Sequence, residues 1–349
     1  MEYVEKYMRR AMHLALQGQG LVSPNPMVGC VIVKNDSIIG EGWHKKYGEA
    51  HAEVNAINAV VDKSMLDGAD LFVNLEPCAH HGKTPPCADL IAQYPFSTVY
   101  FSNIDPNPLV AGKGSERILA AGIKVYQGAL EDEGKILNRR FFSRHEQKRP
   151  YVVLKWAETA DGFIAKKNYD SKWISGMLSR KLVHKWRSQE DAVLVGTNTV
   201  LFDNPQLNVR DWEGRDPIRV FIDKKLQVSQ GAHVFDKSQP TVCFNYLKSG
   251  VENQVEYVKV ESIDDMDEAI LNHLHERGVS SILVEGGAHL LQSFINKGWW
   301  DEARVFTANQ TFEDGIRAPR LIGAQLISKE NIEKDELKVF RNGNSKKLS

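Results

Sequence analysis

Four side chains in the early part of the chain have the types and spacing of a catalytic metal site. They are His51, Glu53, Cys78 and Cys87. One imidazole and two thiolates are ligands that zinc prefers, and a catalytic zinc keeps its fourth position open for water. Glu53 lies two residues from the histidine and is not needed as a ligand, so it can accept and relay the protons of an attacking water. The pattern therefore predicts a hydrolytic zinc site in which Glu53 is the catalytic residue.

The spacing of the two cysteines departs from the usual pattern of zinc deaminases. Those enzymes carry H-x-E followed by P-C-x-x-C, whereas the segment AHHGKTPP separates Cys78 from Cys87. Glycine, prolines and polar residues are typical of a loop, which could return Cys87 to the metal. One alternative is that no metal binds: His51 would cap a helix, Glu53 would be solvated and the cysteines would be small buried apolar residues. A second alternative is a structural zinc with His80 or His81 as fourth ligand. Closed structural sites tend to have tighter cysteine spacing, and that interpretation gives Glu53 no role.

Helical and strand patterns alternate along the chain and place these residues in an α/β domain. A predicted helix begins at His51, a predicted strand ends shortly before Cys78, and a second predicted helix begins at Cys87. Strands alternating with helices favour a three-layer α/β/α architecture. The strands expected in this half are 28–33, 38–43, 71–75, 98–101 and 123–126, and the helices are 51–61, 87–94 and 115–121.

The chain turns polar and meets Pro150, where we place a domain boundary. We expect a first domain over residues 1–147 and a second over 148–349. The second half again alternates, which predicts another α/β domain. Its expected strands are 151–156, 192–195, 218–222, 241–244, 255–260, 281–284 and 303–307, and its helices are 266–277 and 288–296.

Composition and charge narrow the class of partner. The 349 residues carry 44 basic and 45 acidic side chains, so no broad basic field exists to hold nucleic acid. No apolar run approaches the roughly 18 residues of a membrane span. The N-terminal segment is acidic and its apolar residues have helical spacing, which indicates a folded helix instead of an export signal. We therefore expect a cytoplasmic protein with reduced cysteines and a small-molecule substrate.

Four segments of the first half resemble, in order, the bacterial riboflavin-biosynthesis deaminase–reductase family. They are SPNPMVG, GEAHAEVNAI, NLEPCAHHGKTPPC and DPNPLVAGKG. In that family a loop of this length separates the two cysteines. The resemblance implies a cytidine-deaminase-like fold and one zinc ion per chain. It also implies that the pyrimidine and ribose-phosphate pocket is lined by Asn25, His44, Lys83, Thr84 and Asn107.

The second half contains no G-x-G-x-x-G after a strand, so a Rossmann fold has no support. Instead, SILVEGGAHL predicts a strand, a Gly286-Gly287 turn and a helix, where backbone N–H groups could approach a phosphate. This segment, SKWIS and GTNTVLFDNP resemble the reductase half of the same family. The resemblance implies a dihydrofolate-reductase-like α/β fold that uses NADPH.

The same resemblance implies two sets of site residues in the second domain. Those expected to bind NADPH are Glu158, Trp173, Thr199, Asp203, Gly286 and Gly287. Those expected to bind substrate are Lys155, Ser171, Arg187, Leu207, Arg210 and Glu285. Arg187 and Arg210 suit a sugar phosphate, because guanidinium groups match phosphate oxygens.

The combined prediction is a bifunctional enzyme of riboflavin biosynthesis. We expect hydrolytic deamination of 2,5-diamino-6-(5-phosphoribosylamino)pyrimidin-4(3H)-one, followed by NADPH-dependent reduction of the ribosyl chain to ribityl. The product would be 5-amino-6-(5-phosphoribitylamino)uracil, and family habit suggests a homodimer or larger assembly. One alternative is a deaminase attached to a degenerate reductase-fold module. Another is a nucleic-acid deaminase, against which the near-neutral charge argues.

Overall fold

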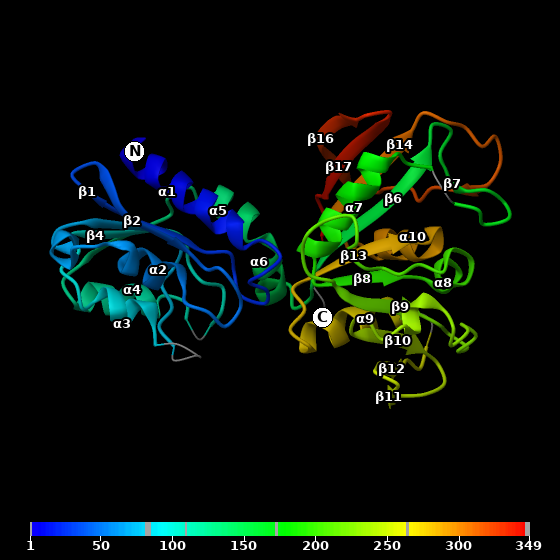
Figure 1. Cartoon of the computed structure of the whole chain (residues 1–349), viewed down its shortest axis with the longest axis horizontal. Helices are drawn as coiled ribbons and strands as arrows, with labels where there is room; N and C mark the ends of the chain where they lie inside the picture. The colour runs from blue at the N-terminus through cyan, green and yellow to red at the C-terminus, as the bar shows by residue number, and fades with distance from the viewer. Residues whose placement is uncertain (1, 81–84, 109, 172–173, 263–264, 346–349) are drawn as a thin grey trace. The chain divides into compact units, whose positions relative to one another are not determined.

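The structure, a computed structural model, describes residues 2–80, 85–108, 110–171, 174–262 and 265–345 (Figure 1). The chain divides into two compact units, Met1–Glu146 and Gln147–Ser349. None of the helices in the described ranges is long and apolar enough to cross a lipid bilayer.

The first unit is built on a five-stranded sheet with the order β2-β1-β3-β4-β5. β1 pairs antiparallel with both of its neighbours, whereas β3, β4 and β5 are parallel. Parallel neighbours need crossover connections, and helices supply them here. The strands are β1 (Gly29–Lys34), β2 (Ser37–Trp43), β3 (Asp70–Leu75), β4 (Thr98–Asn103) and β5 (Lys124–Gln127).

Helices cover both faces of this sheet, which confirms the expected three layers (Figure 1). On one face, Met8 and Ala11 of the first helix pack against Val31 and Phe72. On the other face, Ile32 packs with the apolar residues of three helices. Strand side chains alternate between faces, so neighbouring residues serve different layers. The helices are α1 (Glu2–Ala15), α2 (Ala52–Ala59), α3 (Cys87–Ile91), α4 (Lys113–Ala120), α5 (Glu131–Leu137) and α6 (Arg139–Glu146), with short 3-10 turns at Leu16–Gly18 and Lys63–Leu66.

The second unit contains a ten-stranded sheet with the order β11-β12-β10-β9-β8-β13-β6-β14-β17-β16. Its seven neighbouring strands from β12 to β14 are parallel. Their near-continuous apolar runs are typical of strands buried on both faces. The strands are β6 (Tyr151–Thr159), β8 (Ala192–Val195), β9 (Ile218–Ile222), β10 (Thr241–Asn245), β11 (Gly250–Glu252), β12 (Val255–Lys259), β13 (Ser281–Gly286), β14 (Glu302–Ala308), β16 (Ala324–Ile332) and β17 (Asp335–Asn342).

Helices again cover both faces of the sheet, so the second expected α/β domain is confirmed. Val183 and Trp186 of one helix pack on Tyr151 and Leu283, while Phe294 belongs to the cluster on the opposite face. The helices are α7 (Met177–Gln189), α8 (Thr197–Asp203), α9 (Met266–Glu276) and α10 (Ala288–Lys297), with a 3-10 turn at His233–Phe235. A separate ribbon pairs β7 (Phe163–Ala165) with β15 (Ile316–Arg317).

Helix α7 and the hairpin β16–β17 are additions to the elements expected from sequence. The two are joined by Asp335, whose carboxylate accepts hydrogen bonds from the backbone N–H of Gly176 at 2.7 Å and the hydroxyl of Ser179 at 2.5 Å. A carboxylate at this position satisfies N–H groups that a helix start leaves unpaired and suits the positive end of the helix dipole. The last strand therefore holds the beginning of α7.

Two candidate active sites

The three expected zinc ligands meet at one point of the first unit. His51 stands immediately before α2, Cys78 follows β3, and Cys87 is the first residue of α3. Their ligand atoms all lie within 4.8 Å of one another. His51 Nδ1 is 3.6 Å from the Cys78 sulfur and 3.3 Å from the Cys87 sulfur. One nitrogen and two sulfurs at this separation fit a zinc ion that keeps an open position.

The alternative of a closed structural site finds no support in the described residues. His80 is exposed and does not belong to the cluster, and His81 lies outside the described residues. Cys78 is prepared as a ligand, because a hydrogen bond from the Cys87 thiol lowers its pKa to about 4 despite burial, with His51 contributing. A thiol must lose its proton to bind zinc, so Cys78 is suited to be a ligand. The hydrogen bond to Cys78 and burial raise the pKa of Cys87, so of the two thiols Cys78 loses its proton first.

Glu53 lies in the first turn of α2, beside the ligands and away from solvent. Its side chain is only 4% exposed, which argues against a solvated surface carboxylate. Burial and the negative charge of Cys78 raise the pKa of its carboxyl. A buried carboxyl next to the open position of a metal is suited to accept and return protons.

Two of the expected substrate residues lie next to the zinc ligands. Asn25 Nδ2 is 3.2 Å from His44 Nε2, and the rings of His44 and His51 meet edge to face with centroids 5.3 Å apart. His44 is buried, and burial lowers its pKa, which favours the neutral ring. Lys83 and Thr84 lie outside the described residues.

Glu76 is a residue of this site that sequence reasoning missed. It is 3% exposed and accepts hydrogen bonds from the backbone N–H groups of Gly112 at 3.0 Å and Ser115 at 3.1 Å, and from the Ser115 hydroxyl at 3.1 Å. The N–H of Asp105 approaches the same carboxylate at 3.4 Å. Glu76 thus joins the end of β3 to the loop that carries Asn107. The sequence feature that could have identified Glu76 is its position directly before Pro77 and the zinc ligand Cys78.

The second unit contains a cavity of about 820 Å³. It gathers the expected residues of this unit with two exceptions. Trp173 lies outside the described residues, and Glu158 is absent from the lining; its carboxylate accepts a hydrogen bond from the indole N–H of Trp156 at 2.8 Å. The expected residues that line the cavity are Lys155, Ser171, Arg187, Thr199, Asp203, Leu207, Arg210, Glu285, Gly286 and Gly287.

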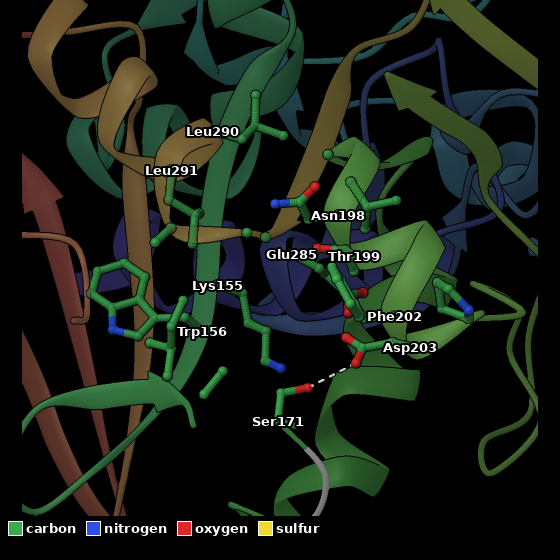
Figure 2. A pocket seen from close by; sticks show the side chains of 18 of the residues that line it. Lys155, Trp156, Ser171, Asn198, Thr199, Phe202, Asp203, Glu285, Leu290 and Leu291 are labelled. Carbon is green, nitrogen blue, oxygen red and sulfur yellow. Dashed lines mark hydrogen bonds between the residues drawn. The ribbon is translucent and has the colours of Figure 1, made fainter. Parts of the chain in front are cut away.

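Figure 2 shows how strand β6 and helix α8 direct side chains into this cavity. The Ser171 hydroxyl donates a hydrogen bond to Asp203 at 3.0 Å. Lys155 projects from β6 into the same cavity. Burial and the nearby Arg187 charge lower the pKa of Lys155, with the Glu285 carboxylate acting in the opposite direction. Charged and apolar groups thus converge as in a small-molecule site.

Arg187 and Glu285 are paired with each other in this cavity. The Nε and one terminal nitrogen of Arg187 donate to the two carboxylate oxygens of Glu285 at 2.6 and 2.8 Å, and its other terminal nitrogen donates to the carbonyl of Asn208 at 3.0 Å. Burial acts to raise the pKa of Glu285, but the charge and hydrogen bonds of Arg187, with smaller contributions from Lys155 and His184, together outweigh burial and the pKa is lowered. From sequence, both residues were expected to bind substrate, and the ion pair between them was not predicted.

The glycine turn before α10 leaves an uncapped helix start at the cavity. Gly286 has a φ of +135°, a conformation that side chains rarely adopt, and α10 begins with no side-chain cap. Its first backbone N–H groups are therefore available for an anion. A Cβ atom at Gly287 would stand 3.6 Å from the Thr199 hydroxyl, an ordinary van der Waals contact.

Two family models match the chain. The "Cytidine and deoxycytidylate deaminase zinc-binding region" matches residues 1–103, and the "RibD C-terminal domain" matches residues 150–345. Their division agrees with the two kinds of site that the structure holds.

Relatives and solved structures match across both units. Riboflavin biosynthesis protein RibD of Actinobacillus pleuropneumoniae is 40% identical over 91% of this chain and 84% of its own. RibD of Aquifex aeolicus is 39% identical over 90% of this chain and 89% of its own. The structure of a Thermotoga maritima diaminohydroxyphosphoribosylaminopyrimidine deaminase/5-amino-6-(5-phosphoribosylamino)uracil reductase matches with a TM-score of 0.90 and 39% identity, covering 98% of this chain and 99% of that one. A structure of Acinetobacter baumannii RibD matches with a TM-score of 0.90 and 32% identity, covering 97% and 99%.

These likenesses extend over nearly the full length of the relatives and include both sites. The chain therefore belongs to the RibD family, the bifunctional deaminase–reductases of riboflavin biosynthesis, which use zinc in one half and NADPH in the other.

Proposed function

We propose that residues 1–147 carry the zinc-dependent deaminase and residues 148–349 the NADPH-dependent reductase, acting on successive forms of one substrate. The first substrate is 2,5-diamino-6-(5-phosphoribosylamino)pyrimidin-4(3H)-one and the final product is 5-amino-6-(5-phosphoribitylamino)uracil. The observation that carries this proposal is the convergence of three zinc ligands within 4.8 Å, in a chain that also holds a separate cavity of about 820 Å³. The reactions named for the Thermotoga maritima relative support the choice of substrate.

In the deaminase site, Glu53 is the residue that moves protons. Zinc held by His51, Cys78 and Cys87 supplies a Lewis acid that makes water a nucleophile at neutral pH. Glu53 accepts a proton as water attacks the ring carbon that bears the amine, then passes protons to the ring nitrogen and the departing ammonia. Its burial keeps bulk water from competing for these protons.

The remaining deaminase residues hold the substrate. Asn25 and His44, which lie beside His51, orient the pyrimidine. Asn107, on the loop that Glu76 secures, lines the ribose side. Lys83 and Thr84 stay predictions for the phosphate end.

In the reductase cavity, the protein positions two reactants. When bound, NADPH would supply a hydride to the sugar C1′, and the ring oxygen released as the ribosyl group becomes ribityl would take up a proton. The Gly286-Gly287 turn and the first N–H groups of α10 hold its phosphates, and Thr199 and Asp203 line the same groove. Arg210 holds the substrate phosphate together with the remaining N–H groups of Arg187.

We also propose that the enzyme works in the cytoplasm as a homo-oligomer of two or more chains. All four cysteines are free in the structure, as expected in a reducing compartment. Analytical ultracentrifugation of the purified chain tests the assembly: a monomer at micromolar concentration would contradict it.

Mass spectrometry of the products tests the proposed reactions. The full chain is incubated with the diaminopyrimidinone phosphate, with and without NADPH. We expect a deaminated product without NADPH and a deaminated, ribityl-containing product with it. Deamination alone in both samples, together with no saturable NADPH binding, would identify the second unit as a degenerate module. Deamination of an RNA oligonucleotide in place of the pyrimidine would indicate a nucleic-acid deaminase.

A further inference from the structure

His184 is a buried histidine at the reductase cavity for which the proposed mechanism has no role. It lies on α7, one turn before Arg187 and one turn after Arg180, and all three side chains line the cavity together with Arg210. Residues three and four apart share one face of a helix. The His184 side chain is 3% exposed, so it lies away from bulk solvent, among the arginines that line this part of the cavity.

The ring of His184 joins α7 to the loop that carries Arg210. Its Nδ1 is 3.0 Å from the carbonyl oxygen of Asn208, and its Nε2 is 3.3 Å from a carboxylate oxygen of Asp211. The backbone N–H of Arg210 lies farther from Nδ1, at 3.4 Å. The shorter contact decides the tautomer, so we assign a proton to Nδ1 that is donated to Asn208.

This contact is one of several that hold the loop, since Val209 N–H also donates to Asp216 at 2.6 Å and Gln239 donates to the Leu207 carbonyl at 3.2 Å. Arg187 donates to the same Asn208 carbonyl at 3.0 Å, and a terminal nitrogen of Arg210 donates to the Asn208 side chain at 3.0 Å. Leu207, just before, is buried with a positive φ of 57°. His184 and Arg187 thus both join α7 to the Asn208 carbonyl, in the segment that carries Arg210.

Two oxygen atoms face the two ring nitrogens, but a neutral imidazole has only one N–H to donate. Only the imidazolium satisfies both Asn208 and Asp211. Burial and the positive charges of Arg187 and Arg210 oppose that charge and lower the pKa of His184, while Asp211 acts in the opposite direction. On the β13 side, the carboxylate of Glu285 also faces the ring but is neutralised by Arg187.

We propose that His184 is a positioning residue for the phosphate end of the reductase cavity, and that it takes up a proton when a dianionic phosphate group binds beside Arg187 and Arg210. The bound dianion offsets the two guanidinium charges that, together with burial, oppose protonation of the ring. The imidazolium then holds both Asn208 and Asp211, which fixes the Arg210 loop around the anion. This inference rests on the proposed reductase function and assigns a further residue to it.

Sulfate inhibition of NADPH oxidation by the full-length enzyme tests the proton uptake. Sulfate stays dianionic over the useful range, whereas a phosphate ester itself titrates near pH ~6. We expect the sulfate inhibition constant of the wild type to rise about tenfold between pH ~5.5 and pH ~8, as the histidine loses its proton. His184→Asn keeps a donor for Asn208 but cannot gain a proton, so its inhibition constant should change less than about twofold over this range. An equal pH dependence in the two proteins would overturn the proposal.

The positioning role is tested with a second pair of variants. His184→Ala removes the contact to the loop and should raise the KM for the phosphorylated substrate about tenfold or more, with a smaller change in kcat. His184→Asn should restore most of that KM. His233→Asn, on an exposed 3-10 turn outside the cavity lining, is the matched control. An unchanged KM in His184→Ala would contradict the role, whereas a wild type without NADPH oxidation would instead contradict the proposed function.

Discussion

Arg187 and Glu285 form a two-pronged ion pair inside the reductase cavity, with N–O distances of 2.6 and 2.8 Å. Their side chains are 11% and 8% exposed, and they come from α7 and from the end of β13. The pair fixes the direction of the guanidinium before substrate arrives, which leaves its remaining N–H groups to meet an incoming anion. The rigid geometry is a consequence of pairing two charges that burial would otherwise penalise.

We expect Arg187→Met to destabilise the second unit by about 3–5 kcal/mol, because it leaves a buried carboxylate without its partner. The double variant Arg187→Met/Glu285→Met should recover most of this stability, while both variants lose NADPH-dependent reduction. Urea unfolding followed by tryptophan fluorescence measures the effect in the full chain, since every tryptophan except Trp43 lies in this unit. Deamination should be unchanged in both variants. If deamination were lost to the same extent as reduction, the two sites would not be independent.

The same pair predicts how acid affects this unit. Because the pKa of Glu285 is lowered in the folded protein, its contribution to stability is complete above the ordinary value of about 4.3 and is lost as the pH falls through the folded value. We expect the wild type to lose more stability than the double variant when the pH is lowered from ~5 to ~3. Parallel losses of urea midpoint in the two proteins would count against a titrating Glu285.

Glu53→Gln should reduce deamination by at least ~100-fold, because an amide cannot accept and return the proton of the attacking water. Zinc content should stay near one ion per chain, and reduction should be unaffected. Metal analysis and an ammonia-release assay measure the two effects. Glu49→Gln, an exposed neighbour in the same segment, is the control. Loss of zinc from Glu53→Gln would make Glu53 a ligand and overturn its assigned role.

Removal of zinc should separate the two activities. A strong chelator should abolish deamination but leave reduction of the already deaminated substrate intact, since the ligands His51, Cys78 and Cys87 all lie in the first unit. Added zinc should restore deamination, because metal binds the folded site preferentially. Cys87→Ser should reproduce the chelated enzyme and resist rescue at the same zinc concentration. Equal inhibition of reduction by the chelator would show that the second unit also depends on metal.

Glu76→Gln should impair substrate binding more than metal binding. The amide turns one acceptor into a donor that faces the N–H groups of Gly112 and Ser115, at a cost of about 1–3 kcal/mol. We expect the KM of deamination to rise about tenfold with a smaller change in kcat and full zinc content. Glu116 is exposed on α4, the helix that carries Ser115, and the control variant Glu116→Gln should behave as wild type. Normal KM in Glu76→Gln would mean that the Asn107 loop is held by other contacts.

The extent of what sequence could predict differs between the two units. The zinc ligands could be recognised from sequence, because histidine and cysteine are among the few residue types that bind zinc. The segments that contain His51, Cys78 and Cys87 also lie at the beginning or end of predicted helices and strands. Arg187 and Glu285 could be placed in one site by resemblance, but their bond joins positions 98 residues apart, which no local pattern reveals. The edge strand β16 was not predicted, because most of its residues are exposed and it therefore lacks the apolar–polar alternation of a half-buried strand. Glu76 and His184 act by holding loops that are distant in sequence. The conformation of these loops could not be predicted from sequence, so the role of neither residue could be identified in advance.

The cap that Asp335 places on α7 has a consequence for the order in which the two activities become available during translation. Asp335 leaves the ribosome 156 residues after its partner Ser179, whereas every zinc ligand precedes the second unit entirely. Domains tend to fold from the N-terminus as they are made. A nascent chain can therefore complete its hydrolytic centre while α7 still lacks the carboxylate that secures its first turn. We therefore expect the reductase to mature after the deaminase, and ribosome-bound chains stalled before residue 335 should deaminate without reducing.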